Sequence, residues 1–144
     1  IIMEGDYDSS VCKLITYYKT SEYKFQPNEE WYVSLLFKID DRTYISTKGE
    51  WERLMVDPTR RMLTNNIRVF SREEIEMHHM SHVRKDLRKK YINSSARENF
   101  GNKIDWWVDF YNNFDESMVG AGFPGNVEHK IIKTEKLFDI GNCC

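Results

Sequence analysis

The segment from residue 75 to 91 constrains the fold most, because the spacing of its apolar residues changes part-way along. Ile75 and Met77 alternate with polar residues, and this period of two predicts a short strand. Farther along, the apolar residues lie four apart, at Val83, Leu87 and Tyr91. That spacing predicts a helix with one buried stripe, running from about Ser81 to Asn93. Ser81 is expected to cap this helix by accepting a backbone N–H bond.

Three of the chain's four histidines, His78, His79 and His82, lie where this pattern changes. They are expected at the end of a strand and beside a helix start, where unpaired N–H groups and a partial positive charge favour ligands. A histidine near a carboxylate can bind a divalent cation or transfer a proton. The alternative is three ordinary histidines, one buried and hydrogen-bonded and two solvated. The chain has no H-E-x-x-H pattern, so a self-contained hydrolytic zinc site is not expected.

Short segments rich in β-branched and aromatic residues predict further strands. These are Val11–Lys19, Ile67–Phe70 and His129–Lys133. Trp31–Ile39 is apolar on both faces, so it is either a buried strand or a short helix. Arg42–Ser46 is expected to form a hairpin with it, because Asp40 and Asp41 favour a turn.

Residues 103–114 carry the clearest helix pattern in the chain. Apolar side chains follow the spacing i, i+3, i+4 and i+7, at Ile104, Trp107, Val108 and Tyr111. The Trp107 ring is expected to pack in the core, since large rings on a helical stripe usually do. Residues 94–96 either continue or break the preceding helix. Gly120–Gly125 is expected to be a flexible loop, and its spacing is not that of a phosphate-binding loop.

These patterns predict an α+β fold derived from an α/β fold, with a small mixed sheet followed by two or three helices. A chain of 144 residues is long enough for one domain with a real core, but not for two. We expect a single domain or part of one. It would be strand-rich over residues 9–80 and helical over 81–116, with a tail over 117–144.

Composition excludes several classes of function. A formal net charge of -2 provides no overall field to attract nucleic acid or an anionic membrane. The longest apolar run is too short to span a bilayer. The cysteines, Cys12, Cys143 and Cys144, show no C-x-x-C spacing, which favours a reduced, cytoplasmic protein.

Two acidic residues and a basic run are candidates for chemistry. Glu29 and Glu30 follow a proline and precede Trp31, which suits a general base beside a sugar. The alternative is a pair of solvated carboxylates. Arg84 and Lys85 begin a basic run after the histidines. They could hold a phosphate, although a solvated helix surface is the simpler interpretation.

Several phrases of the sequence are similar to one enzyme family. Residues 77–86 (MHHMSHVRKD), followed by 93–96 (NSSA), resemble the C-terminal part of glycosyltransferases of the GT-A fold. The resemblance is to a family-two-like branch common in large viruses, phages and bacteria. It extends to residues 8–12, 16–19, 27–33, 56–60 and 136–138, and so covers most of the chain in the family's order.

The resemblance implies the second, acceptor-side half of a GT-A fold, with a nucleotide-sugar donor, a glycan or protein acceptor and a divalent cation, Mn²⁺ or Mg²⁺. A histidine in the second half of these enzymes often completes the metal site, and by the match this would be His78 or His79. An acid often deprotonates the acceptor hydroxyl, and by the match this would be Glu29 or Glu30. The cation would offset the charge of the leaving diphosphate.

The match also suggests that Arg84 or Lys85 helps to hold the diphosphate, and Trp31 is a candidate to contact the substrate. One departure is large: the chain is expected to begin after the nucleotide-binding half and its D-x-D motif, because Asp6-Tyr7-Asp8 follows no hydrophobic strand and looks like a turn. We therefore expect a truncated domain, completed by a longer protein or by another chain. One alternative is a non-catalytic structural or binding module, derived from such an enzyme and contacting other chains in a viral or phage particle. Another is an unrelated small α+β interaction domain.

Overall fold

A computed structural model of the protein describes residues 5, 7–41, 66–94, 96–124 and 126–136. The chain divides into two compact units. The first unit consists of residues 1–14 and 30–77, and the second of residues 15–29 and 78–144. Each unit contains part of two strands, β1 (Ser9–Tyr18) and β5 (Glu76–His82), since the boundary between the units falls within both.

The first unit is a small mixed sheet. The first part of β1 pairs antiparallel with β3 (Tyr32–Phe37) and parallel with β4 (Ile67–Val69). Its buried core consists of Cys12, Leu14, Val33 and Phe70, with Leu35, Ile75 and Met77 packed against them. The segment 31–39 therefore contains a strand rather than a helix, because the neighbouring β1 provides backbone partners for it. The strand predicted at Arg42–Ser46 lies outside the described residues.

The second unit contains an antiparallel sheet with the strand order β1-β2-β7-β6. Its further strands are β2 (Thr20–Gln26), β6 (Gly122–Phe123) and β7 (Asn126–Lys133). Lys19 joins β1 to β2 in a tight turn, with a φ of 66° in the left-handed region. The sequence reasoning missed β2, although its side chains alternate between buried and exposed positions in the period of a strand.

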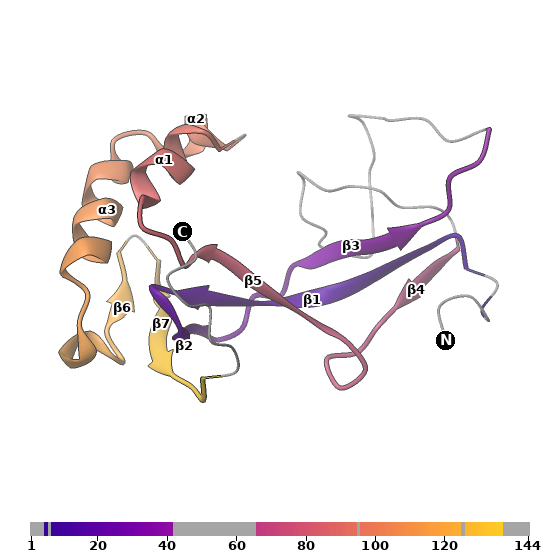
Figure 1. The fold of residues 1–144 in the computed structure, drawn as a ribbon, viewed down its shortest axis with the longest axis horizontal. Helices are drawn as coiled ribbons and strands as arrows, with labels where there is room; N and C mark the ends of the chain where they lie inside the picture. The colour runs from indigo at the N-terminus through magenta and orange to yellow at the C-terminus, as the bar shows by residue number, and fades with distance from the viewer. Residues whose placement is uncertain (1–4, 6, 42–65, 95, 125, 137–144) are drawn as a thin grey trace. The chain divides into compact units, whose positions relative to one another are not determined.

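Three helices complete the second unit: α1 (Leu87–Ile92), α2 (Arg97–Phe100) and α3 (Lys103–Asn113). A single 3₁₀ turn, η1 (Glu116–Met118), follows. The helices α1 and α3 lie side by side and pack against each other (Figure 1). The buried core is mainly aromatic and consists of Tyr18, Tyr23, Phe25, Leu87, Tyr91, Tyr111, Phe114 and Ile131.

The structure corrects the prediction at the histidines. The strand does not end near Ser81 but continues to His82, and the helix begins only at Leu87. Asp86 caps this helix, because its carboxylate accepts a 2.9 Å hydrogen bond from the Lys89 backbone N–H. The prediction of Ser81 as the cap is therefore wrong. The histidines lie at the end of a strand, as expected, but residues 83–86 separate them from the helix.

Other local predictions are confirmed. The helix α3 has almost the predicted bounds, and Trp107 packs against the aromatic core. The helix α1 ends at Ile92, so it does not continue into residues 94–96. The loop prediction for Gly120–Gly125 is wrong in part, because the short strand β6 lies within that segment. The predicted α+β class is confirmed, since the described residues form a mixed sheet with three helices. The strands β6 and β7 follow the helices, so residues 122–133 are not the tail that was expected there. Among the helices described, none is long and apolar enough to cross a bilayer.

Candidate functional site

Within the second unit, β1 and β5 bring a predicted histidine close to a predicted acid. The Thr16 hydroxyl donates a 2.7 Å hydrogen bond to Oε2 of Glu29. The same hydroxyl oxygen lies 3.3 Å from Nδ1 of His79. A hydroxyl has one proton to donate, and the Thr16 hydroxyl donates it to Glu29. The Thr16 oxygen therefore accepts from the N–H at Nδ1 of His79. We call this imidazole–hydroxyl–carboxylate chain the Glu29 relay.

Burial helps to hold the Glu29 relay in place. Thr16 is only 2% exposed, while Glu29 and His79 are half-buried at its two ends. A buried hydroxyl with both neighbours within hydrogen-bond distance has little freedom to rotate. Thr16 was missed in the sequence reasoning, because nothing in a β-branched strand residue marks it as a contact between two distant polar groups.

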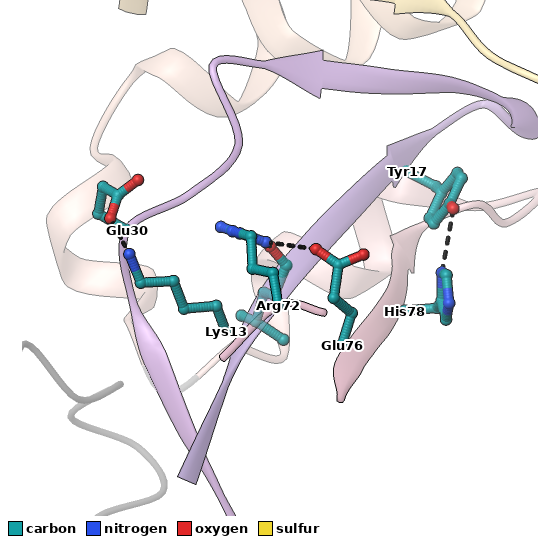
Figure 2. A network of polar contacts seen from close by, with 7 residues as sticks. Lys13, Tyr17, Glu30, Arg72, Glu76 and His78 are labelled. Carbon is teal, nitrogen blue, oxygen red and sulfur yellow. Dashed lines mark hydrogen bonds and ion pairs between the residues drawn. The ribbon is translucent and has the colours of Figure 1, made fainter. Parts of the chain in front are cut away.

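His78, the other predicted cation ligand, has a different partner. Its Nδ1 atom lies 3.0 Å from the hydroxyl of Tyr17, as Figure 2 shows. The two ring centroids are 5.7 Å apart, and Tyr17 itself is buried. Neighbouring strand residues point to opposite faces, so His78 and His79 meet different side chains of β1.

The acids predicted as a pair, Glu29 and Glu30, belong to different units. In the first unit Glu30 forms an ion pair with Lys13 (Figure 2). The hydrogen bond from Lys13 and its positive charge lower the pKa of the Glu30 carboxyl. Trp31, also in the first unit, is 41% exposed. The Glu29 relay therefore includes neither Glu30 nor Trp31.

A second ion pair of the first unit lies between Arg72 and Glu76, with 3.0 Å between Nη1 and Oε1 (Figure 2). The same Arg72 nitrogen donates to the backbone oxygen of Leu14 at 3.0 Å. The guanidinium thus links the start of β5 to β1. We interpret the Arg72–Glu76 pair as structural, because Arg72 Nη1 donates both to Glu76 and to the Leu14 backbone within the unit.

His82, the third histidine of the segment, packs among aromatic rings of the second unit. Its ring centroid lies 6.2 Å from that of Tyr18, 5.8 Å from that of Phe25 and 5.9 Å from that of Tyr91. Burial, with the nearby charge of Lys90, holds the pKa of His82 well below its usual value. This meets only in part the alternative of one buried and two solvated histidines, because His82 and His79 are both half-buried with polar partners and only His78 is exposed.

Arg84 and Lys85, the predicted phosphate ligands, are both exposed. The backbone at Arg84 is fixed by Tyr111, whose hydroxyl donates to the Arg84 carbonyl oxygen at 2.5 Å and accepts from its N–H at 3.3 Å. The Arg84 side chain lines a hollow beside α1, together with Lys89 and Lys90. Lys85 is not among the residues that line it. The sequence reasoning treated Lys89 and Lys90 only as part of the basic run.

The donors for a divalent cation are incomplete in the part of the chain that the structure describes. No three His, Cys, Asp or Glu side chains there lie close enough together to hold a metal ion. The Glu29 relay offers one carboxylate and one imidazole, and both bind the Thr16 hydroxyl. A cation needs more ligands than these two, so we derive no chemical step through one.

The chain matches no protein-family model, no curated protein and no solved structure.

Proposed function

We propose that the second unit provides the acceptor side of a glycosyl transfer from a nucleotide-sugar donor, with Glu29 as the general base. The observation that carries this proposal is the Glu29 relay, in which a predicted acid and a predicted histidine share the Thr16 hydroxyl. Two groups from distant parts of the sequence meet at one buried oxygen. That arrangement suits a base that must be held in one orientation.

In the proposed step, the oxygen of the acceptor hydroxyl forms a bond to the anomeric carbon of the donor sugar. The bond from that carbon to the diphosphate oxygen breaks, and the nucleoside diphosphate leaves with the electron pair. The proton of the acceptor hydroxyl passes to Glu29. Thr16 and His79 are positioning residues, because they contact the carboxylate or its hydrogen-bond donor rather than the sugar.

The donor and any cation would be bound largely by residues other than those of the Glu29 relay. The resemblance implies Mn²⁺ or Mg²⁺, and the described residues do not complete a site for either. The proposal therefore assigns only acceptor activation to this unit. Acid–base assistance of this kind contributes about 10²–10⁴-fold to a rate.

The test is a transfer assay on the full chain. UDP- and GDP-hexoses are incubated with a glycan panel and Mn²⁺, and glycosylated products are measured by mass spectrometry. Glu29→Gln should lower the rate by about 100-fold or more. Thr16→Val should also lower the transfer rate. Thr16→Ser, which keeps the hydroxyl, should retain most of the rate.

Glu128→Gln is the matched control, because it removes a carboxylate exposed on β7 of the same unit. It should leave the rate unchanged. If no donor and acceptor give transfer, or if Glu29→Gln is as active as the unmodified chain, the proposal is wrong.

A second candidate is a non-catalytic module that binds other protein chains. It is favoured by the packing of His82 among aromatic rings and by the exposure of Trp106, which is 53% exposed. Exposed tryptophans are common in protein interfaces. Concentration-dependent association that is lost in Trp106→Ser, in a chain without transfer activity, would support this candidate.

A further inference from the structure

A hollow of about 440 Å³ lies on the second unit, beside α1, and we call it the basic hollow. It is lined by Arg84, Asp86, Lys89, Lys90, Asn93 and Ser94. The loop after β5, the helix α1 and the loop after α1 all contribute to it. The residues of the Glu29 relay do not line it.

Positive charge exceeds negative charge in the basic hollow. Its one carboxylate, Asp86, is already bound to the backbone N–H of Lys89 at the helix start. Arg84 forms no ion pair with the residues that the structure describes. Arg88, on the same helix, differs because it pairs with Asp105 at 2.6 Å. The guanidinium of Arg84 is therefore available for an anion.

Lys90 is also poorly neutralised. The residue is half-buried, and its Nζ atom lies 3.0 Å from His82 Nε2 and 4.8 Å from the centre of the Tyr91 ring, which are both neutral partners. Burial and the charge of Arg84 lower the pKa of Lys90 to about 8, against a smaller opposing effect of Glu29. A bound anion would relieve this repulsion between two neighbouring cations.

We propose that the basic hollow binds a phosphoryl dianion, with Arg84 and Lys90 as its cations and Asn93 and Ser94 as neutral donors. A guanidinium can bind two phosphate oxygens at once. The Ser94 oxygen accepts from the Ala96 backbone N–H at 3.2 Å, so its own proton can be donated to the ligand. This proposal does not rest on the glycosyl transfer proposed above.

The ligand's organic part has a place beside the phosphate. A second hollow, of about 460 Å³, shares Asn93 and Ser94 with the basic hollow and is otherwise lined by Ile92, Arg97 and Glu98. A phosphomonoester could therefore put its phosphoryl group in the first hollow and its carbon skeleton in the second. Inorganic phosphate would fill only the first, so a sugar phosphate should bind more tightly.

The experiment is a titration of the full chain, followed by amide NMR shifts and by calorimetry, near neutral pH and at physiological salt. The probes are inorganic phosphate and glucose 1-phosphate, each tested separately. Both should bind saturably and shift the amide signals of α1. Arg84→Gln should weaken the binding of both probes about tenfold or more, since hydrogen bonds to charged groups are the strong ones.

Arg88→Gln is the matched control, because it removes the same charge from the same segment but lies outside the basic hollow. It should change the affinity less than about twofold, as expected for a screened surface charge. Arg84→Gln should still fold, because Tyr111 holds residue 84 through its backbone. Circular dichroism checks this.

The proposal is overturned if neither probe binds saturably, or if Arg88→Gln weakens binding as much as Arg84→Gln does. Thr16→Val, which breaks the Glu29 relay, should retain phosphate binding. The two proposals can therefore fail independently of each other.

Discussion

The Nζ atom of Lys90 lies 3.0 Å from Nε2 of His82. An ammonium group can only donate hydrogen bonds, so Nε2 must accept, and the ring proton of neutral His82 is on Nδ1. Ser81 Oγ lies 3.3 Å from that atom and can accept from it. The contact thus favours a neutral, oriented imidazole. Burial is the main cause of the lowered pKa of His82, and the charge of Lys90 adds to it.

The first prediction concerns stability in mild acid. The folded pKa of His82 lies well below its usual value of 6.5, so the unfolded chain binds more protons at this site between the two values. The contribution of His82 to the free energy of unfolding should therefore be complete above pH 6.5. The free energy of unfolding should fall as the pH drops below 6.5. Urea unfolding at a series of pH values measures this slope.

The control for that slope is His82→Phe, which keeps a ring among the aromatic neighbours but cannot titrate. It should flatten the slope just below pH 6.5. Glu30 and Glu116 also have lowered pKa values, but they act only below their usual value of 4.5. If the slope of stability against pH between pH 4.5 and pH 6.5 is unchanged in His82→Phe, its assignment to His82 is contradicted.

A second prediction concerns the pH range of phosphate binding. A phosphomonoester becomes a dianion above about pH 6. Lys90 contacts His82 and the ring of Tyr91, and the charges of Arg84 and Glu29 act on it. Its pKa is about 8, so it loses its charge above that pH. Affinity for glucose 1-phosphate should be highest between these values and should decline on either side. In Lys90→Met the decline above pH 8 should disappear, as calorimetry over this range would show.

A third prediction compares two buried tyrosines of the same core. Tyr111→Phe removes the donor to the Arg84 carbonyl and should lower the free energy of unfolding by about 1–3 kcal/mol. The Tyr18 hydroxyl is buried and has no hydrogen-bond partner among the described residues. Tyr18→Phe should therefore be neutral or stabilising, because it removes a polar group that folding leaves unsatisfied. Urea midpoints that fall equally in both variants would contradict this.

A fourth prediction uses adjacent tryptophans on α3. Trp107 contacts the rings of Tyr91 and Phe100, with centroids 5.2 Å and 5.4 Å away, and its indole N–H donates to the Pro124 oxygen at 2.8 Å. Trp107→Ala should therefore cost about 2–4 kcal/mol of stability. Trp106 is 53% exposed, and Trp106→Ala should stay within about 0.5 kcal/mol. Thermal unfolding of the two variants measures the difference.

Local periodicity explains which elements could be predicted. The helix α3 and the strands β1, β4 and β7 follow patterns visible within about ten residues, since backbone geometry alone sets those periods. The start of α1 was placed too early because Val83 has the spacing of the helical stripe. The bond from the Val83 N–H to the Met80 oxygen turns the chain at the end of the strand, and residues 83–86 separate it from the helix.

The sequence by itself determined the α+β class, the histidine-bearing strand and the pool of charged residues from which a site could be made. Only the tertiary structure decided which of them meet. His79 reaches Thr16 across 63 residues, Glu29 and Glu30 separate into different units, and Lys90 rather than Lys85 lines the basic hollow. The physical reason is that spacing along a chain fixes which face a side chain takes, whereas strand pairing and loop paths fix what it faces.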